Sequence, residues 1–287
     1  MKKIVSLALV VLMLATCVCA FASCSSEKNV KIGVQAGTTG AFFLSGNTEI
    51  GFNGYSNVDV SEFTTGALAV ADMLNGNVDY VVIDNSVAQA LVAANSGKIK
   101  MIDYALTTEN YGIGVDKNQP ELLAAINKLL SEKKDEIKAL YTKYASVTDE
   151  NSAAWSGSTV TSAVQDDSKN QLVVATNAQF APYEFTVGDK YAGIDMELAK
   201  LIADELGMEL VIKDMEFDSV VTSIGKNGVD VAISGLTINP ARAKVVNFSD
   251  PYEEGAYQVI IAKVDDTTFD ACKSSEDVLN ILASLKK

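Results

Sequence analysis

Hydrophobic and polar residues alternate in two different rhythms between residues 30 and 146. Short runs rich in β-branched residues predict strands at 30–35, 80–83 and 112–115. Runs with apolar residues three and four positions apart predict helices at 64–74, 86–94 and 121–144, the last of which follows Pro120. Strands separated by helices predict a mostly parallel α/β sheet.

The same alternation resumes at Leu172 and predicts a second α/β unit. Its strands cover residues 172–176, 210–214 and 229–234, and its helices cover residues 194–206, 219–226 and 274–287. Helix 194–206 has one apolar face, which is typical of a helix that packs on a sheet. This face carries Ile194, Leu198, Leu201, Ile202 and Leu206. Residues 147–169 are rich in Ser, Thr, Asp and Asn with little periodicity, so we expect a solvated linker.

The first residues have the layout of a secretory signal. Two lysines precede an uncharged apolar run, residues 4–21, which is followed by small residues around Cys24. This ending resembles a bacterial lipobox, so we expect residues 1–23 to be removed and Cys24 to carry the lipid anchor. Stable anchoring needs more than one acyl chain, which the lipoprotein modification supplies. Phe21 stands where leucine is usual, and ordinary secretion or a retained helix are the alternatives.

Charge and composition exclude several classes of function. Removal of residues 1–23 takes away two lysines and no acidic residue, which changes the net charge from −14 to −16. Such a chain lacks the basic patches that nucleic-acid binding requires, and its acidity favours solubility outside the cell. The absence of histidine excludes His bases, His triads and His metal ligands. With Cys17 and Cys19 in the signal and Cys24 lipidated, Cys272 has no disulfide partner.

Two long segments are similar to the periplasmic amino-acid-binding proteins of ABC transporters, the bacterial solute-binding protein family 3. Residues 172–263 resemble the first half of the family through VVATNAQFAPYEF (173–185), YAGIDMELAKLIADELGMEL (191–210), FDSVVTSIGKNGVDVAISGLTINPARAKVVNFSDPY (217–252) and YQVIIAK (257–263). Residues 31–144 resemble the second half through KIGVQAGTTG (31–40), GALAVADMLNGNVDYVVID (66–84) and YGIGVDKNQPELLAAINKLL (111–130).

The two halves stand in reversed order, which we interpret as a circular permutation. In the family, a helix such as 274–287 runs directly into a strand such as 31–37, whereas here these segments are the two ends of the chain. Termini that were once joined lie close in space, and permutation at such surface sites is tolerated. Residues 147–169 then bridge the old termini, with a random-coil span of about 25 to 30 Å. The alternative is a dimer in which two chains swap halves.

The resemblance implies a two-lobed α/β fold, the periplasmic-binding-protein fold of type II. The implied lobes are lobe 1, residues 112–146 plus 170–261, and lobe 2, residues 27–110 plus 264–287. Each lobe is discontinuous, and strands near 110–117 and 257–263 cross between them. Such lobes close on a ligand by a hinge motion that excludes water.

The resemblance also implies a site for the two charges of a free amino acid. Arg242 matches the family arginine that clamps the α-carboxylate through two parallel hydrogen bonds, and its alternative is a solvated surface arginine. Asp84 matches the aspartate that pairs with the α-ammonium, and it also suits the N-cap of the following helix. Gly235 and Thr237 match positions that offer a backbone N–H or a hydroxyl to the ligand, and Ser234 precedes them.

A glycine and two threonines complete the polar part of this site. Gly37, Thr38 and Thr39 follow a strand and open a helix, so their N–H groups are expected to face the carboxylate in the field of a helix start. A plain turn with an N-cap is equally compatible with the spacing. Phe180 and Phe217 match the aromatic walls around the ligand side chain, and their alternative is a place in the hydrophobic core.

Asn177 bears on which amino acid is bound. It stands where binders of basic amino acids often carry an acid, so a neutral side chain, polar or apolar, is favoured. Glu184 nearby is a second source of charge. A cationic side chain in a closed cleft would lose its hydration without finding an anion.

Together these features predict an extracytoplasmic lipoprotein that captures a free amino acid for an ABC permease. We expect a monomer without catalytic activity, metal or cofactor. The alternatives are an enzyme on the same fold, such as a dehydratase, and a domain that only senses its ligand. An enzyme needs a carboxylic acid with a raised pKa near the ligand, and beyond Asp84 only Glu184 is a candidate.

Overall fold

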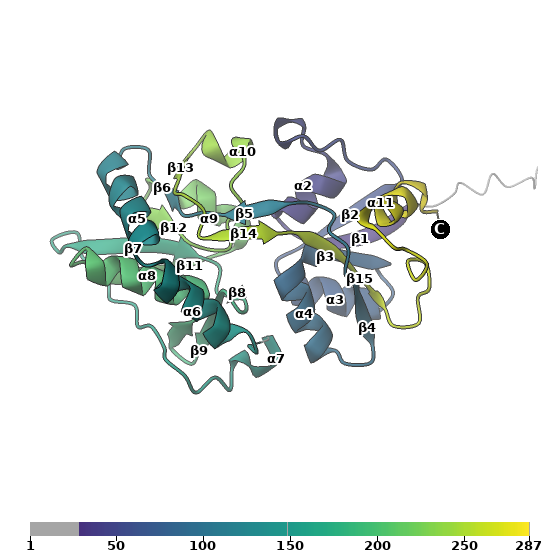
Figure 1. Ribbon diagram of the computed structural model, residues 1–287, viewed down its shortest axis with the longest axis horizontal. Coiled ribbons are helices and arrows are strands. Elements are labelled where there is room, and N and C mark those ends of the chain that lie inside the picture. Colours follow the sequence, from purple (N-terminus) through teal and green to yellow (C-terminus); the bar gives the residue numbers. More distant parts are fainter. Residues whose placement is uncertain (1–28, 148, 287) are drawn as a thin grey trace, which may run out of the picture.

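The computed structural model describes residues 29–147 and 149–286, and it consists of two α/β lobes joined by a pair of strands (Figure 1). This is the two-lobed α/β fold that the sequence predicted. The predicted signal, residues 1–23, and the lipidation residue Cys24 lie outside the described residues.

Lobe 2 is built on a five-stranded sheet whose apolar strands lie in the middle. The sheet order is β2 (Val58–Phe63), β1 (Val30–Gln35), β3 (Tyr80–Asp84), β15 (Gln258–Lys263) and β4 (Ile99–Ile102). The first three strands are parallel, and β15 runs antiparallel to both of its neighbours. The helices of this lobe are α2 (Thr39–Ser45), η1 (Thr48–Ile50), α3 (Gly66–Leu74), α4 (Asn85–Ala94) and α11 (Ser275–Ser284).

Lobe 1 is built on a second five-stranded sheet. Its order is β11 (Glu209–Asp214), β7 (Gln171–Thr176), β12 (Val231–Ala232), β6 (Gly114–Val115) and β13 (Asn247–Phe248). A small antiparallel sheet of β8 (Gln179–Phe180), β9 (Glu184–Val187) and β10 (Lys190–Ala192) adjoins it. The helices are α5 (Pro120–Glu132), α6 (Lys134–Tyr144), α7 (Asp149–Ser152), α8 (Ile194–Glu205), α9 (Phe217–Ser223) and α10 (Pro240–Ala243).

The connection between the lobes is a two-stranded antiparallel ribbon of β5 (Glu109–Tyr111) and β14 (Glu253–Ala256) (Figure 1). The sequence analysis placed one crossing strand at 257–263 and ended lobe 1 at residue 261. In the structure the crossing is at β14, because β15 pairs with β3 and β4 inside the sheet of lobe 2. Its apolar residues Val259, Ile260 and Ile261 are fully buried there.

Two other elements differ from their predictions. The single helix expected at 121–144 is two helices, α5 and α6, because Lys133 leaves the helical conformation (φ −107°, ψ 22°). Its ammonium reaches Glu205 of α8 at 2.6 Å, which ties the break to a neighbouring helix. The edge strands β2 and β4 were not predicted, because polar residues interrupt them, whereas the central strands are apolar at nearly every position.

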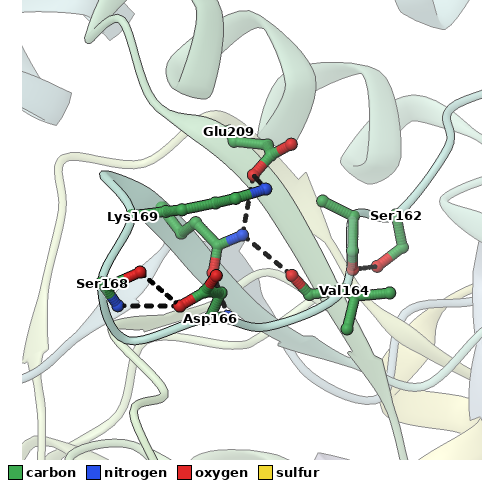
Figure 2. A network of polar contacts seen from close by, with 8 residues as sticks. Ser162, Val164, Asp166, Ser168, Lys169 and Glu209 are labelled. Carbon is green, nitrogen blue, oxygen red and sulfur yellow. Dashed lines mark hydrogen bonds and ion pairs between the residues drawn. The ribbon is translucent and has the colours of Figure 1, made fainter.

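Residues 147–169 were expected to be a solvated linker, but residues 153–169 lie against lobe 1, and α7 contacts both β9 of lobe 1 and α4 of lobe 2. The Trp155 ring stacks on Tyr144 with ring centroids 4.9 Å apart, and Val160 is buried. Figure 2 shows the end of this segment, where the Ser168 hydroxyl and N–H donate to Asp166 and Lys169 pairs with Glu209 of β11. These contacts hold the segment to the lobe, so the random-coil description does not apply to it.

The described ends of the chain lie together on lobe 2. Val30 at the start of β1 and Leu285 after α11 line the same hollow. The Asn57 side chain donates to the carbonyl oxygens of Leu282 and Leu285, at 2.9 and 3.1 Å. Within a single chain, α11 therefore packs on the sheet to which β1 belongs, which is the arrangement that a permuted monomer requires.

Candidate functional site

The candidate site lies between the lobes, which are closed on one another by direct contacts. The Thr39 hydroxyl of lobe 2 donates to the Thr237 hydroxyl of lobe 1 at 3.0 Å. The Gln35 amide donates to Asn177 at 3.2 Å, and an Arg242 nitrogen donates to the backbone oxygen of Gly37 at 3.0 Å. Each of these three bonds joins one lobe to the other.

Arg242 is a buried cation at the centre of this interface. It lies on α10, which Asn239 caps by accepting the Arg242 N–H at 2.9 Å. Its guanidinium donates to the Thr237 carbonyl at 3.0 Å and stands 5.5 Å from the centre of the Phe217 ring. Burial lowers the pKa of Arg242 to about 10. The charges of Glu109 and Asp84 oppose this shift, because they favour the ionised form of Arg242. The alternative of a solvated surface arginine is therefore wrong.

Asp84 lies at the end of β3, buried opposite this cation. It does not cap α4 with its side chain but accepts the Tyr111 hydroxyl at 2.5 Å. Burial, and then the nearby charge of Glu109, raise the pKa of Asp84 to about 7. Hydrogen bonds from Tyr111 and Gln258 oppose this rise.

Glu109 is a site residue that sequence reasoning missed. It lies on β5 of the connecting ribbon and is buried. Its carboxylate accepts the hydroxyls of Thr107 and Thr237, at 2.6 and 2.5 Å, and the Gln258 amide at 3.0 Å. The one signal in the sequence was an acid placed just before the predicted strand 112–115, and no periodicity shows that this acid faces the cleft.

The glycine and threonines before α2 have mixed roles. Gly37 has φ +74°, and its carbonyl accepts from Arg242. The Thr38 hydroxyl caps α2 by accepting from Ala41 and donates to the Gln35 carbonyl at 2.7 Å, so the N-cap alternative holds for Thr38. The Thr39 hydroxyl reaches the opposite lobe.

Residues 234–237 approach the site from lobe 1, and two buried acids of this lobe hold Ser234 and Gly235. The Gly235 N–H donates to Asp195 at 2.7 Å, so the donor that the sequence analysis assigned to a ligand is already bonded. The Ser234 hydroxyl donates to Glu184 at 2.6 Å and accepts the Asn177 N–H at 3.1 Å. Glu184 is fully buried and therefore belongs to the support of this segment.

Asn177 and the two phenylalanines complete the lobe 1 side. The Asn177 amide donates to the Met215 carbonyl at 2.8 Å, while its oxygen accepts from lobe 2. Phe180 stacks on Tyr183 at 5.7 Å and belongs to a hydrophobic cluster, as its core alternative proposed. Phe217 also borders a hollow of about 220 Å³ beside Arg242 at the cleft rim.

The arrangement suits a small zwitterion. One guanidinium and one carboxylate, Arg242 and Asp84, lie close enough to influence each other's charge, with hydroxyls and amides between the lobes. Within residues 29–147 and 149–286 there is no cluster of three or more Cys, Asp or Glu side chains suited to a metal ion. None of the helices in that part of the chain has both the length and the apolar character of a membrane span.

The comparisons with known proteins concern mainly lobe 1 and the segment that follows it. The family model of the bacterial extracellular solute-binding proteins, family 3, matches residues 172–285. The arginine-binding extracellular protein ArtP of Bacillus subtilis is 37% identical over 98 residues, which is 34% of this chain and 38% of that protein. The L-cystine-binding protein TcyJ of Escherichia coli is 29% identical over 111 residues, 38% of this chain and 41% of that protein.

A cyclohexadienyl dehydratase of Pseudomonas aeruginosa is 33% identical over 82 residues, which is 28% of this chain and 31% of that protein. The chain thus spans between 31% and 41% of the length of these curated relatives. The relatives are mainly amino-acid-binding proteins of transport systems, with this dehydratase among them. Residues 172–285 are therefore similar to the bacterial extracellular solute-binding proteins of family 3.

Proposed function

We propose that this protein captures a free amino acid between its lobes and delivers it to an ABC importer. The observation that carries the proposal is the pair of opposite charges, Arg242 from lobe 1 and Asp84 from lobe 2, buried at one closed interface. A buried cation and a buried anion that are not bonded to each other are suited to the two charges of a zwitterion.

The ligand contacts follow from the chemistry of these groups. The α-carboxylate takes the place of the Gly37 and Thr237 carbonyls on the Arg242 guanidinium, because a carboxylate bonds such a fork more strongly than neutral oxygens do. The α-ammonium pairs with Asp84. Thr39 and Thr237, whose hydroxyls now bond each other, line the same interface.

We propose a neutral ligand side chain, polar or apolar. Glu109 already accepts three hydrogen bonds, and Glu184 is bonded to Ser234 inside lobe 1, so neither carboxylate is free for a second cation. Asn177 bonds across the cleft with an amide that carries no charge. The arginine-binding relatives make arginine the competing candidate.

Heating the protein with each of the twenty amino acids tests this proposal. A ligand at a hundred times its dissociation constant should raise the free energy of unfolding by about 2.7 kcal/mol. Calorimetric titration of the stabilising ligands should then give tighter binding of glutamine or cystine than of arginine. No stabilisation by any of the twenty contradicts amino-acid capture, whereas tightest binding of arginine contradicts only the neutral side chain.

The enzyme alternative rests on the dehydratase relative and on the raised pKa of Asp84. We favour binding without catalysis, because Asp84 in its ionised form is the partner that an ammonium needs. Nuclear magnetic resonance of the bound amino acid over several hours separates the two functions. An unchanged ligand supports transport, and a new product contradicts it.

We further propose that the protein is a permuted monomer, in which residues 147–169 join the old termini, and that a lipid on Cys24 anchors it outside the cell. Cys24→Ser removes the acceptor of the lipid, so the variant should appear in the culture medium. Light scattering of the released protein should give the mass of one chain. Retention on the membrane contradicts the anchor, and the mass of two chains supports the swapped dimer.

A further inference from the structure

Two carboxyl groups lie side by side beneath the segment 234–237. Glu184 begins β9 and Asp195 lies in the first turn of α8, and both are fully buried. One oxygen of each group is satisfied: Glu184 accepts the Ser234 hydroxyl at 2.6 Å, and Asp195 accepts the Gly235 N–H at 2.7 Å and the Tyr252 hydroxyl at 2.9 Å. A third buried acid, Glu109 of the connecting ribbon, accepts the Thr237 hydroxyl at the other end of the segment.

The second oxygens of the two groups have no protein donor. Glu184 Oε2 and Asp195 Oδ1 are both buried without a hydrogen-bond partner. The two residues are neighbours, because the Asp195 N–H donates to the Tyr183 carbonyl at 2.9 Å and the adjacent Ser234 and Gly235 donate to one acid each. Two ionised carboxylates cannot satisfy each other, because both are acceptors. A single proton between the two oxygens satisfies both atoms and removes the repulsion of two buried charges.

We propose that Glu184 and Asp195 share one proton at neutral pH, and that the pair so formed positions residues 234–237 for the ligand. The inference rests on the proposed function, because it assigns a supporting role at the same site. Glu184 and Asp195 do not touch the ligand in this scheme. They act through Ser234 and Gly235, so they are positioning residues.

The surroundings of the pair determine which group is ionised. The start of α8 favours a negative charge on Asp195, and the Gly235 and Tyr252 donors stabilise that charge. The titratable neighbours that most affect the pair are acids or phenols. They are Asp214 at the end of β11, Glu253 on β14, Tyr141 on α6, and Tyr183 and Tyr252.

These neighbours favour a retained proton on Glu184. Burial, and then the charge of Asp195, raise the pKa of Glu184 well above its ordinary value. The pKa of Asp195 rises only to about 6, because its rise through burial is opposed by the Gly235, Tyr252 and Glu184 hydrogen bonds. Near neutral pH the pair therefore consists of a protonated Glu184 that donates to an ionised Asp195.

Gly235 shows why the pair matters for the ligand. Its φ of +51° is left-handed, and a Cβ there would lie 2.9 Å from the Phe180 ring. The bond to Asp195 fixes this turn, and Thr237 follows two residues later with its carbonyl on Arg242. A loss of the pair would release the turn that places Thr237 and the Arg242 guanidinium.

The proton is tested by the pH dependence of unfolding. The folded state holds a proton on Glu184 that the unfolded chain has lost, so the stability contributed by that proton decreases as pH rises. Between about pH 6.5 and 7.5 the unfolding equilibrium constant of wild type should increase with pH more steeply than that of Glu184→Gln. The ratio of the two constants should grow by about tenfold per pH unit. Glu209→Gln, an exposed glutamate on β11, is the control and should keep the wild-type slope. Equal slopes for wild type and Glu184→Gln overturn the shared proton.

The positioning role is tested by calorimetry with the amino acid that stabilises wild type most. Glutamine donates to Asp195 and accepts from Ser234 as the protonated acid does, so Glu184→Gln should bind within about twofold of wild type. Glu184→Leu can do neither and should bind at least about tenfold more weakly. Wild-type affinity in Glu184→Leu overturns positioning. If Glu184→Leu does not fold, the positioning role is overturned by weak binding of the ligand to a folded Glu184→Gln. Absence of any ligand for wild type counts against the proposed function, and the unfolding slopes still decide whether the proton is shared.

Discussion

Arg242→Ala should weaken amino-acid binding by roughly thirtyfold to several thousandfold, equivalent to about 2 to 5 kcal/mol. The closed cleft would then bury the ligand carboxylate without the cation that now contacts the Gly37 and Thr237 carbonyls. Asp84→Ala should cost a similar amount, because it leaves the ammonium unpaired. Calorimetric titration with the best ligand of wild type measures both losses.

A second variant tests whether the guanidinium of Arg242 is needed or only its positive charge. Arg242→Lys should also bind substantially more weakly, because one ammonium cannot make the two parallel bonds of a guanidinium. Lys200→Ala is the matched control, since Lys200 is exposed and forms a surface ion pair with Asp204 within α8 of lobe 1. It should bind within about twofold of wild type, because such pairs contribute little. Wild-type affinity in both Arg242→Ala and Asp84→Ala would show that the ligand site lies elsewhere.

Ligand affinity should fall about tenfold for each pH unit below about pH 7, because the ammonium pairs only with ionised Asp84. The pKa of Asp84 is about 7 in the ligand-free protein, through burial and the neighbouring charge of Glu109. Below this pH the ligand has to displace a proton. Glu109, Arg242 and Tyr111 are the other titratable groups at this position, and Arg242 and Tyr111 keep their protons in this range. Calorimetry at pH 5, 6, 7 and 8 measures the slope.

Asp84→Asn separates this proton from other effects of pH. The variant should bind weakly, but with an affinity that no longer changes between about pH 5 and 7. The same shift has a consequence for the ligand-free fold. Since the pKa of Asp84 is raised above its ordinary value of 3.8, the folded protein takes up a proton as pH falls from about 7 to 4, and its stability from this group rises. A wild-type affinity that is constant from pH 5 to 7 would contradict the role of Asp84.

The sequence predicted the architecture because each lobe follows simple periodicities. Strands such as β3 and β7 are apolar at nearly every position, and α8 has one apolar face, so both kinds of element were found within two residues of their ends. The helix break at Lys133 was missed because the apolar spacing continues through it, while Lys133 itself contacts Glu205 of another helix. Tertiary contacts of this kind leave no local pattern.

The candidate site was predictable only in part, for the same reason. Arg242 and Asp84 stand in motifs, and the structure buries both at the interface between the lobes. Glu109 was missed because it lies on the connecting ribbon, where burial depends on how the two lobes meet. Gly235 was assigned to the ligand because sequence spacing could not show that Asp195, forty residues earlier, accepts its N–H.

The place of β15 in lobe 2 has a consequence for synthesis of the chain. Lobe 1 is one uninterrupted stretch, whereas the sheet of lobe 2 receives β15, between β3 and β4, only after all of lobe 1 has been made. Domains fold largely in the order in which they leave the ribosome. While lobe 1 is being made, β3 and β4 have no strand between them, and their open edges are the part of the nascent chain most exposed to wrong pairing. In a chain that emerges from its N-terminal end, lobe 2 therefore stays unfinished until lobe 1 is complete.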